Sequence, residues 1–322
     1  MIDIDGSMGE GGGQILRSSL GLSLVTGEPI RIDRIRAARK KPGLMRQHLA
    51  CVRAAAVVGC AEVSGDEIGS TRLEFRPGHL QGGHFAFAIS GAGSTILVIQ
   101  TVLPALLSAP EASTVVVRGG THNPLAPSFD FFDRVFLPVL RRMGARVEAR
   151  LDRHGFFPAG GGAVTVHVEP VTRLNPVELL DRGELTELRG RILLSKLPAT
   201  IGEREQKQVA TQLGWPASRT SIEHIEDSPG PGNVVMLEAG DGTHCELITG
   251  HAMRGLAAER VAHEAATELQ EYLAASVPVG VHLADQLLIP MALAGGGLYR
   301  THRPSLHTTT NAQVVQRFLG TP

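Results

Sequence analysis

The chain has 322 residues, a formal net charge of −1 and only three cysteines. This length exceeds one small core and fits about two domains. The balanced charge excludes a global attraction to nucleic acid or to a membrane, so a nucleic-acid partner needs a local basic patch. Few cysteines, odd in number and without metal-ligand spacing, predict reduced thiols and a cytoplasmic location. We expect neither a secretory leader nor a membrane-spanning helix, because no apolar run reaches about 18 residues.

A glycine-rich turn, residues 6–14, joins an N-terminal strand to a predicted helix at residues 15–25. Glu10, Gln14 and Arg17 lie in or beside this turn. A glycine turn that opens a helix suits an anion, because free backbone N–H groups point outward there. An ordinary strand-to-helix connection explains the same pattern, and the Lys-Ser/Thr pair of a Walker loop is absent.

The most basic window of the chain is residues 31–46, with seven cations against one acid, Asp33. Arg39 and Lys40 stand directly before a Lys-Pro-Gly turn. Arginine supplies paired donors and lysine a point charge, so the window suits contacts with phosphates. A solvated charged face is the alternative interpretation.

The order of predicted elements repeats along the chain. A helix, a strand, a helix and two strands follow the glycine turn, and the same order restarts about 80 residues later, after residue 93. A helix, a strand and a helix at residues 285–319 suggest a third copy, delayed by an inserted α/β segment. The chain is therefore predicted to be α/β (α+β), with two repeats at 1–177, a small inserted domain at 178–275, and a third repeat at 276–322.

Two loops at helix edges, residues 119–127 and 282–286, are predicted to border a pocket. Asp285 or Gln286 would contact a nucleotide there, while Pro127 and His282 would offer flat surfaces to its base. The alternative is that the Asp-Gln pair merely caps the apolar helix that it precedes. The scattered histidines elsewhere show no spacing typical of a metal site.

Near the C-terminus, residues 303–311 place His307 before three threonines and an asparagine. A neutral histidine ring can attack phosphorus to form a phosphoramidate. Once this phosphoramidate is protonated, its phosphorus–nitrogen bond breaks easily and histidine leaves. The hydroxyl and amide side chains suit phosphate oxygens and would open a helix at residues 312–319. Alternatively, Thr310 or Asn311 only caps that helix and His307 has no chemical role.

Five motifs occur in a fixed order along the chain. They are Gly9-Glu10-Gly11-Gly12-Gly13-Gln14-Ile15-Leu16-Arg17; Arg36-Ala37-Ala38-Arg39-Lys40-Lys41-Pro42-Gly43-Leu44 with Gln47-His48; Gly119-Gly120-Thr121-His122-Asn123-Pro124; Ala284-Asp285-Gln286-Leu287; and His307-Thr308-Thr309-Thr310-Asn311. Together they resemble the RNA 3′-terminal phosphate cyclase family nearly end to end, the inserted region included.

This resemblance implies a reaction and a fold. In the family, ATP adenylylates a histidine, AMP passes to an RNA 3′-phosphate, and the neighbouring 2′-hydroxyl displaces AMP to leave a 2′,3′-cyclic phosphate. The implied fold is three βαβαββ units in a large domain, related to the enolpyruvyl transferases, with a smaller inserted α/β domain. The implied partners are RNA with a 3′-phosphate end and ATP, with no membrane and no stable protein partner.

The resemblance also assigns roles to positions of this chain. His307 matches the adenylylated histidine, and Glu10 matches a residue that helps to hold Mg²⁺ or Mn²⁺. One position departs from the family, since a tyrosine usually stands where this chain has His282. The positions implied for ATP are Gln100, Pro127, His282, Leu283, Ala284, Asp285 and Gln286. Those implied for phosphate or RNA are Gln14, Arg17, Arg39 and Lys40.

Two other functions compete with this interpretation. A ribosome-biogenesis relative of the family would keep the fold and bind RNA without catalysis. The resemblance implies that such relatives lack the nucleophilic histidine, whereas this chain has His307. An enolpyruvyl transferase is suggested by the repeats alone, and that chemistry explains neither His307 nor the Asp285-Gln286 pair.

Overall fold

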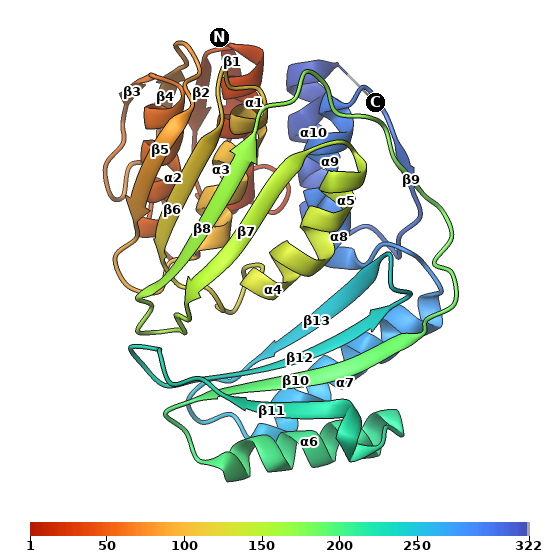
Figure 1. Cartoon of the computed structure of the whole chain (residues 1–322). Coiled ribbons are helices and arrows are strands. Elements are labelled where there is room, and N and C mark those ends of the chain that lie inside the picture. Colours follow the sequence, from red (N-terminus) through yellow and green to blue (C-terminus); the bar gives the residue numbers. More distant parts are fainter. Residues whose placement is uncertain (321–322) are drawn as a thin grey trace.

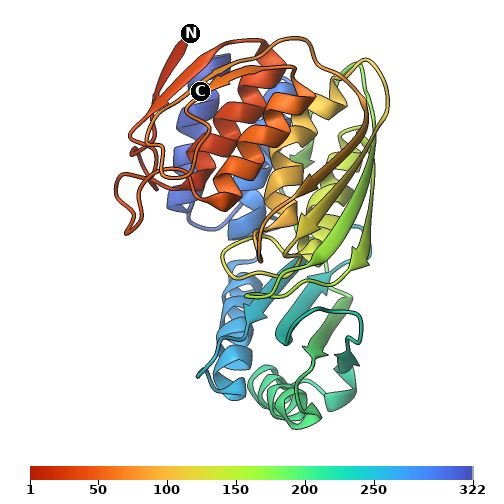
Figure 2. The same ribbon diagram turned by 90° about the vertical axis from the view of Figure 1, so that its left-hand side faces the viewer.

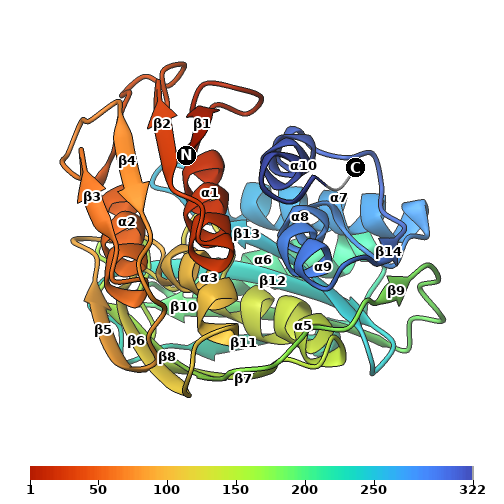
Figure 3. The ribbon, with the colours of Figure 1, turned by 90° about the horizontal axis from the view of Figure 1, so that it is seen from above.

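The computed structural model describes residues 1–320, and it has a larger upper part and a smaller lower part (Figure 1). In the upper part, three sheets surround a bundle of helices, as the view from above shows (Figure 3). The lower part is one four-stranded sheet backed by two helices (Figure 1). The predicted α/β class is confirmed.

The first sheet has the strand order β1-β2-β4-β3, with β1 parallel to β2 and the other pairs antiparallel. Each helix of this unit follows a strand in the chain, and a glycine lies at the C-terminal end of each helix. The elements are β1 (Ile2–Asp5), α1 (Gly13–Thr26), β2 (Ile30–Asp33), α2 (Arg46–Val58), β3 (Glu62–Ser64) and β4 (Leu73–Arg76).

The second sheet repeats this order and these directions as β5-β6-β8-β7. Its strand β5 was not predicted, because four glycines and several polar residues interrupt the apolar pattern of residues 81–93. The single helix predicted at residues 129–143 contains a π-helical turn. The elements are β5 (Gly83–Ala88), α3 (Thr95–Leu107), β6 (Ser113–Gly119), α4 (Phe129–Phe131), η1 (Phe132–Phe136), α5 (Leu137–Arg142), β7 (Arg146–Arg153) and β8 (Gly162–Glu169).

The third sheet has only two strands in residues 1–320, β9 parallel to β14. Residues 1–320 therefore do not contain three complete βαβαββ units, because the third unit lacks its last two strands there. The sequence pattern itself supported only a helix, a strand and a helix here. The elements are β9 (Glu178–Leu179), α8 (Val281–Gln286), α9 (Leu288–Leu293), β14 (Leu298–Tyr299) and α10 (Leu306–Leu319).

The inserted segment forms its own sheet, in the order β11-β10-β12-β13. Helices α6 and α7 cover the face that is turned away from the larger part (Figure 2). The other face contributes Leu193, Val234, Met236 and Leu247 to the main hydrophobic core. The domain limits at 178 and 275 stay predictions. The elements are β10 (Glu187–Ser195), α6 (Ala199–Leu213), η2 (Ala217–Arg219), β11 (Thr220–His224), β12 (Gly232–Gly240), β13 (Cys245–His251) and α7 (Ala258–Ala275).

Helix α1 lies at the centre of the larger part, against α2, α3 and α10. Small side chains on α1 permit this close packing: a Cβ atom at Gly21 would lie 3.0 Å from the carbonyl oxygen of Thr101 on α3. The N-terminal turn of α1 thereby faces the N-terminal turn of α10. No helix in residues 1–320 is both long and apolar enough to cross a bilayer.

Candidate active site

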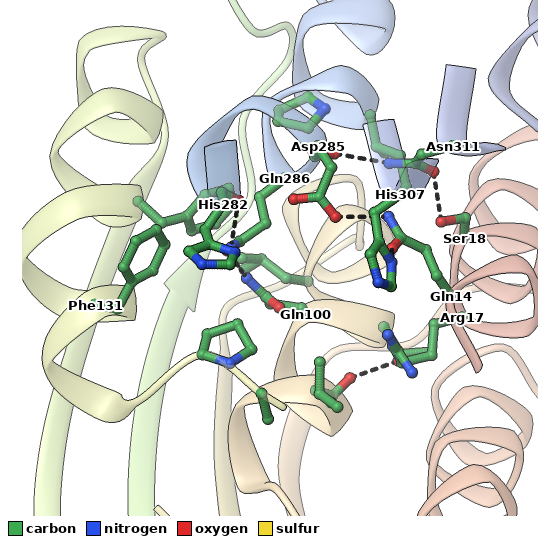
Figure 4. A pocket seen from close by; sticks show the side chains of 18 of the residues that line it. Gln14, Arg17, Ser18, Gln100, Phe131, His282, Asp285, Gln286, His307 and Asn311 are labelled. Atoms are coloured by element: carbon green, nitrogen blue, oxygen red, sulfur yellow. Dashed lines mark hydrogen bonds between the residues drawn. The ribbon is translucent and has the colours of Figure 1, made fainter. Parts of the chain in front are cut away.

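A cavity of about 500 Å³ opens where the repeats and the inserted sheet meet. Its wall comes from α1, α3, the loop that precedes α4, the segment from α4 to α5, β13, α8, α9 and α10 (Figure 4). Segments far apart in sequence thus meet at one place. The predicted site residues in this wall are Gln14, Arg17, Gln100, Pro127, His282, Asp285, Gln286 and His307.

His307 lies in the first turn of α10, and its side chain is half exposed. The helix begins at Leu306, earlier than predicted, and Ser305 is its N-cap because the Ser305 hydroxyl accepts the N–H of Thr308. The prediction that Thr310 or Asn311 caps this helix is therefore wrong. Sequence periodicity missed residues 306–311 because all of them except Leu306 are polar.

Both ring nitrogens of His307 have distinct surroundings. Nδ1 lies 2.6 Å from Oε1 of Gln14, and Nε2 of Gln14 donates to the Asp285 carboxylate at 2.8 Å. Since a carboxylate only accepts, Gln14 turns its amide oxygen toward the ring, and Nδ1 of His307 must carry the proton. The lone pair is then on Nε2. Figure 4 shows this chain of contacts along the cavity wall.

Buried polar contacts hold this chain in place. Asn311 donates to the backbone oxygen of Asp285 at 2.7 Å and accepts from the Ser18 hydroxyl at 2.6 Å. The Thr310 hydroxyl accepts the backbone N–H of Glu10 at 2.9 Å. The polar residues after His307 therefore join α10 to α1 and α8, where the sequence suggested phosphate contacts.

Glu10 faces the free nitrogen of His307. Its Oε1 atom lies 3.9 Å from Nε2 of His307 and pairs with Arg39. Its Oε2 atom is buried and has no hydrogen-bond partner. Residues 1–320 contain no group of three or more metal-binding side chains. A single carboxylate with an unsatisfied oxygen fits Mg²⁺ or Mn²⁺ in the mode where nucleotide phosphates and water complete the coordination.

Burial shifts the pKa values of His307 and Asp285. It lowers the pKa of His307, and Arg17 and Arg39 lower it further, while Asp285 opposes them. Burial raises the pKa of Asp285, and the hydrogen bond from Gln14 counteracts this. The lowered pKa of His307 favours the neutral ring, which is the form that can act as a nucleophile.

A second part of the cavity wall is formed by the amide side chains of Gln100 and Gln286 and by the ring of His282. Gln100 donates to Oε1 of Gln286 at 2.6 Å, and Gln286 donates to the backbone oxygen of His282 at 2.9 Å. The His282 ring pairs with Glu268 of α7 at 3.1 Å. Together with Pro127, which lines the same cavity, these residues offer flat surfaces and amide groups of the kind that bind a nucleobase.

Helix α8 differs from its prediction. It begins at Val281 with Gly280 as the N-cap, so Asp285 lies at its C-terminal end and does not cap an apolar helix. Leu283 and Ala284 are buried and do not line the cavity. The sequence could not separate the five neighbours at 282–286, because only the helical phase decides which of them face the cavity.

Some cations of the basic window, residues 31–46, hold the local structure, and others are exposed to solvent. Arg31 pairs with Glu74, and Arg36 donates to backbone oxygens of its own loop. Arg39 reaches Glu10, whereas Lys40 is exposed and outside the cavity wall. Part of the window is therefore used to hold its loop, and Arg39 alone among these residues touches the site.

No role was predicted for His48, although it lies in the second of the five sequence motifs. Its Nδ1 atom accepts the backbone N–H of Met45, so Nε2 carries the proton. Burial lowers the pKa of His48 to about 3. A Cβ atom at Gly13 would lie 2.5 Å from Nε2 of His48 and 2.8 Å from a nitrogen of Arg17, so these donors crowd the start of α1. His48 does not line the cavity, but Phe131, Thr249 and His251 do, and none of these three was predicted.

A family model for RNA 3′-terminal phosphate cyclase matches residues 8–322. The chain belongs to the RNA 3′-terminal phosphate cyclase family. It is 48% identical to the RNA 3′-terminal phosphate cyclase of Koribacter versatilis, over 99% of this chain and 90% of that protein. The protein of that name from Salmonella enteritidis is 49% identical, over 99% and 94%. Relatives of this coverage make the chain an enzyme of the cyclase family.

Among solved structures, the EPSP synthase of Acinetobacter baumannii matches 65% of this chain and 53% of its own, with 13% identity and a TM-score of 0.26. This likeness is too weak to carry an argument. The relation of the cyclase family to enolpyruvyl transferases thus stays a prediction for this chain.

Proposed function

We propose that this enzyme uses ATP to convert an RNA 3′-terminal phosphate into a 2′,3′-cyclic phosphodiester through a covalent His307–AMP intermediate. The observation that carries the proposal is the contact chain from Asp285 through Gln14 to Nδ1 of His307. It leaves an unprotonated Nε2 atom at the cavity, beside the Glu10 carboxylate.

In the first step, the Nε2 lone pair attacks the α-phosphorus of ATP, the bond from that phosphorus to the bridging oxygen breaks, and diphosphate leaves with the electron pair. A bound Mg²⁺ or Mn²⁺ at Glu10 would neutralise charge on the ATP phosphates. The Nδ1 proton stays on His307, where the Gln14 oxygen stabilises the positive charge that develops on the ring.

In the second step, an oxygen of the RNA 3′-phosphate attacks the same phosphorus, the phosphorus–nitrogen bond breaks, and His307 is regenerated. In the third step, the 2′-hydroxyl oxygen attacks the 3′-phosphorus and gives its proton to solvent, while the bond from that phosphorus to the bridging oxygen breaks and AMP leaves with the electron pair. Adenylylation replaces oxide with AMP as the leaving group. The 2′-hydroxyl is already adjacent, so orientation supplies much of the last step.

The nucleotide would lie along the cavity, with its base between Pro127 and His282 and its phosphates toward Arg17 and His307. The support is that all four residues line one cavity of about 500 Å³. Arg39 and Lys40 stand at the exposed side of the Glu10 loop, where an RNA end would approach.

The test is incubation with α-labelled ATP and Mg²⁺ or Mn²⁺, followed by a denaturing gel and treatment of the labelled band with acid and alkali. We expect a band that is acid-labile and alkali-stable, as a phosphoramidate is, and its loss in His307→Asn. His302→Asn is the matched control, because His302 is an exposed histidine in the loop that precedes α10 and lies outside the cavity wall.

A folded wild-type protein that binds ATP without labelling would overturn the covalent mechanism and favour the RNA-binding relative without catalysis. Labelling that survives in His307→Asn would place the nucleophile elsewhere. Transfer of AMP to RNA and the cyclisation are tested by adding RNA with a 3′-phosphate and separating RNA with a cyclic end from RNA with a linear end.

A further inference from the structure

Helix α8, which presents His282, Asp285 and Gln286 to the cavity, has only six residues. A helix this short is not stable by itself, because its few internal hydrogen bonds do not offset the cost of nucleation. Its N-cap, Gly280, has no side chain to satisfy the first N–H groups. Contacts from other segments must therefore hold it.

Those contacts come from two sides. Within the third repeat, the Tyr299 hydroxyl donates to the oxygen of Ala284 at 2.8 Å, and Asn311 donates to the oxygen of Asp285 at 2.7 Å. Both act on the C-terminal end of the helix. The N-terminal end is held from the inserted sheet, where Glu246 of β13 accepts the backbone N–H of Gly280 at 2.9 Å.

Glu246 is suited to be a cap supplied by another segment. Its side chain is almost wholly buried, at 1% exposure, and its other oxygen accepts the N–H of Leu247 at 3.3 Å. A Cβ atom on Gly280 would lie 2.2 Å from the Glu246 carboxylate. Since the φ angle of Gly280 is −73°, glycine is required here for this close approach and not for backbone freedom.

We propose that Glu246 is a positioning residue for nucleotidyl transfer: it fixes α8 from the inserted sheet, so that Asp285 keeps Gln14, and through it His307, in the reactive arrangement. This inference rests on the proposed function and deepens it. It gives the inserted segment a role in the reaction, in addition to the wall residues Leu247, Thr249 and His251 that β13 supplies.

A second contact from the inserted segment acts on the same helix, since Glu268 of α7 pairs with His282. That pair is partly exposed, whereas the Glu246 contact is buried. An exposed pair contributes little, and loss of a buried acceptor leaves an unsatisfied N–H group at the helix start. We therefore assign the larger effect to Glu246.

The experiment compares Glu246→Ala with Glu246→Gln, which keeps an oxygen that can accept the Gly280 N–H. Glu205→Ala is the matched control. Glu205 is also a fully buried glutamate of the inserted segment, but its partner is Asn233 and it touches neither α8 nor the cavity wall. It therefore reports the effect of general destabilisation.

Two readouts need no ATP. One is hydrogen–deuterium exchange at residues 280–286, and the other is the tautomer of His307 seen by nitrogen NMR, assigned with His307→Asn. Glu246→Ala should lose protection at α8 and lose the pure Nδ1–H form of His307, while Glu205→Ala should keep both. Glu246→Gln should restore most of the protection.

The third readout is single-turnover adenylylation over a range of ATP concentrations. Glu246→Ala should lower the rate at saturating ATP by about tenfold or more, because small displacements of a reacting group are costly. Normal α8 protection with a normal His307 tautomer in Glu246→Ala would overturn the inference. Equal losses of α8 protection and of the Nδ1–H form of His307 in Glu205→Ala would also overturn the inference. Absence of labelling in the wild type would reject the proposed function, while the first two readouts would still decide the role of Glu246.

Discussion

Gln14 Oε1 lies 2.6 Å from Nδ1 of His307, although the two residues are 293 positions apart. This contact determines which ring nitrogen is free for chemistry. Gln14→Glu keeps the shape but places a second carboxylate beside Asp285, which Gln14 now contacts at 2.8 Å. An added negative charge favours the charged imidazolium and so raises the pKa of His307.

We expect Gln14→Glu to slow adenylylation at neutral pH by about tenfold or more and to move the acid limb of the pH–rate profile upward. Gln14→Met is the control, because it removes the hydrogen bond without adding charge. It should slow the reaction without moving that limb. Identical profiles for the two variants would show that charge at this position does not govern His307.

The pH profile of the wild-type protein is a separate prediction. Burial is the largest cause that lowers the pKa of His307. A lowered pKa means that the neutral ring persists to lower pH, so adenylylation should be lost only below about 6.5, the ordinary value for histidine. Single-turnover labelling between pH 5 and pH 8, at saturating ATP and metal, measures it. A midpoint above the ordinary value would contradict a desolvated nucleophile.

Arg39→Ala should separate the two halves of the reaction. Arg39 pairs with Glu10 but does not line the cavity, and its side chain is 45% exposed. We expect adenylylation within a few-fold of wild type, and transfer of AMP to RNA 3′-phosphate lowered by about tenfold, as for a lost phosphate contact. Lys41→Ala, at an exposed position of the same turn, is the control. Unfolding of the variant, seen by circular dichroism, would undercut this role.

Gly9 tests the contact between the glycine turn and α10. Gly9 and Gly27 both have positive φ angles, 52° and 74°, so alanine is strained at either position. Only at Gly9 would the new Cβ collide, 2.1 Å from the Thr310 hydroxyl, because nothing lies within 4 Å at Gly27. Gly27→Ala should cost about 1–2 kcal/mol of unfolding free energy.

Gly9→Ala should cost more than Gly27→Ala in denaturant unfolding, and it should also slow adenylylation, since the collision breaks the Thr310 contact with the Glu10 backbone. Equal unfolding free energies for the two variants would mean that the turn adapts to the extra methyl group.

Glu205 links stability to pH. Burial raises its pKa to about 7, above the ordinary 4.5. Between these values the unfolded state has lost a proton that the folded state keeps, so stability falls as pH rises from about 4.5 to about 7. Glu205→Gln removes this slope, and its stability relative to wild type should grow across that window by up to about 3 kcal/mol. Urea unfolding at pH 5 and pH 7.5 measures it, and an unchanged difference between the two pH values would contradict it.

Much of the site was predictable from local signals. The glycine turn, the position of His307 near a helix start, and most helices and strands follow from residue type and periodicity. The errors are local in the same sense. Helix α10 starts six residues earlier than predicted because five of those residues are polar. Asp285 lies at the C-terminal end of α8 and not before a helix, because the N-cap is Gly280, which gives no side-chain signal.

The sequence by itself determined the family and the chemistry that is available, since a histidine, a carboxylate and a set of cations are properties of residue type. Only the tertiary structure decided which of them meet. Gln14, Asp285 and His307 come together because small residues let α1 pack closely in the helical core, and Glu246 reaches α8 because the inserted sheet closes the cavity. Contacts across nearly 300 residues depend on how helices and sheets pack, and no local pattern encodes that packing.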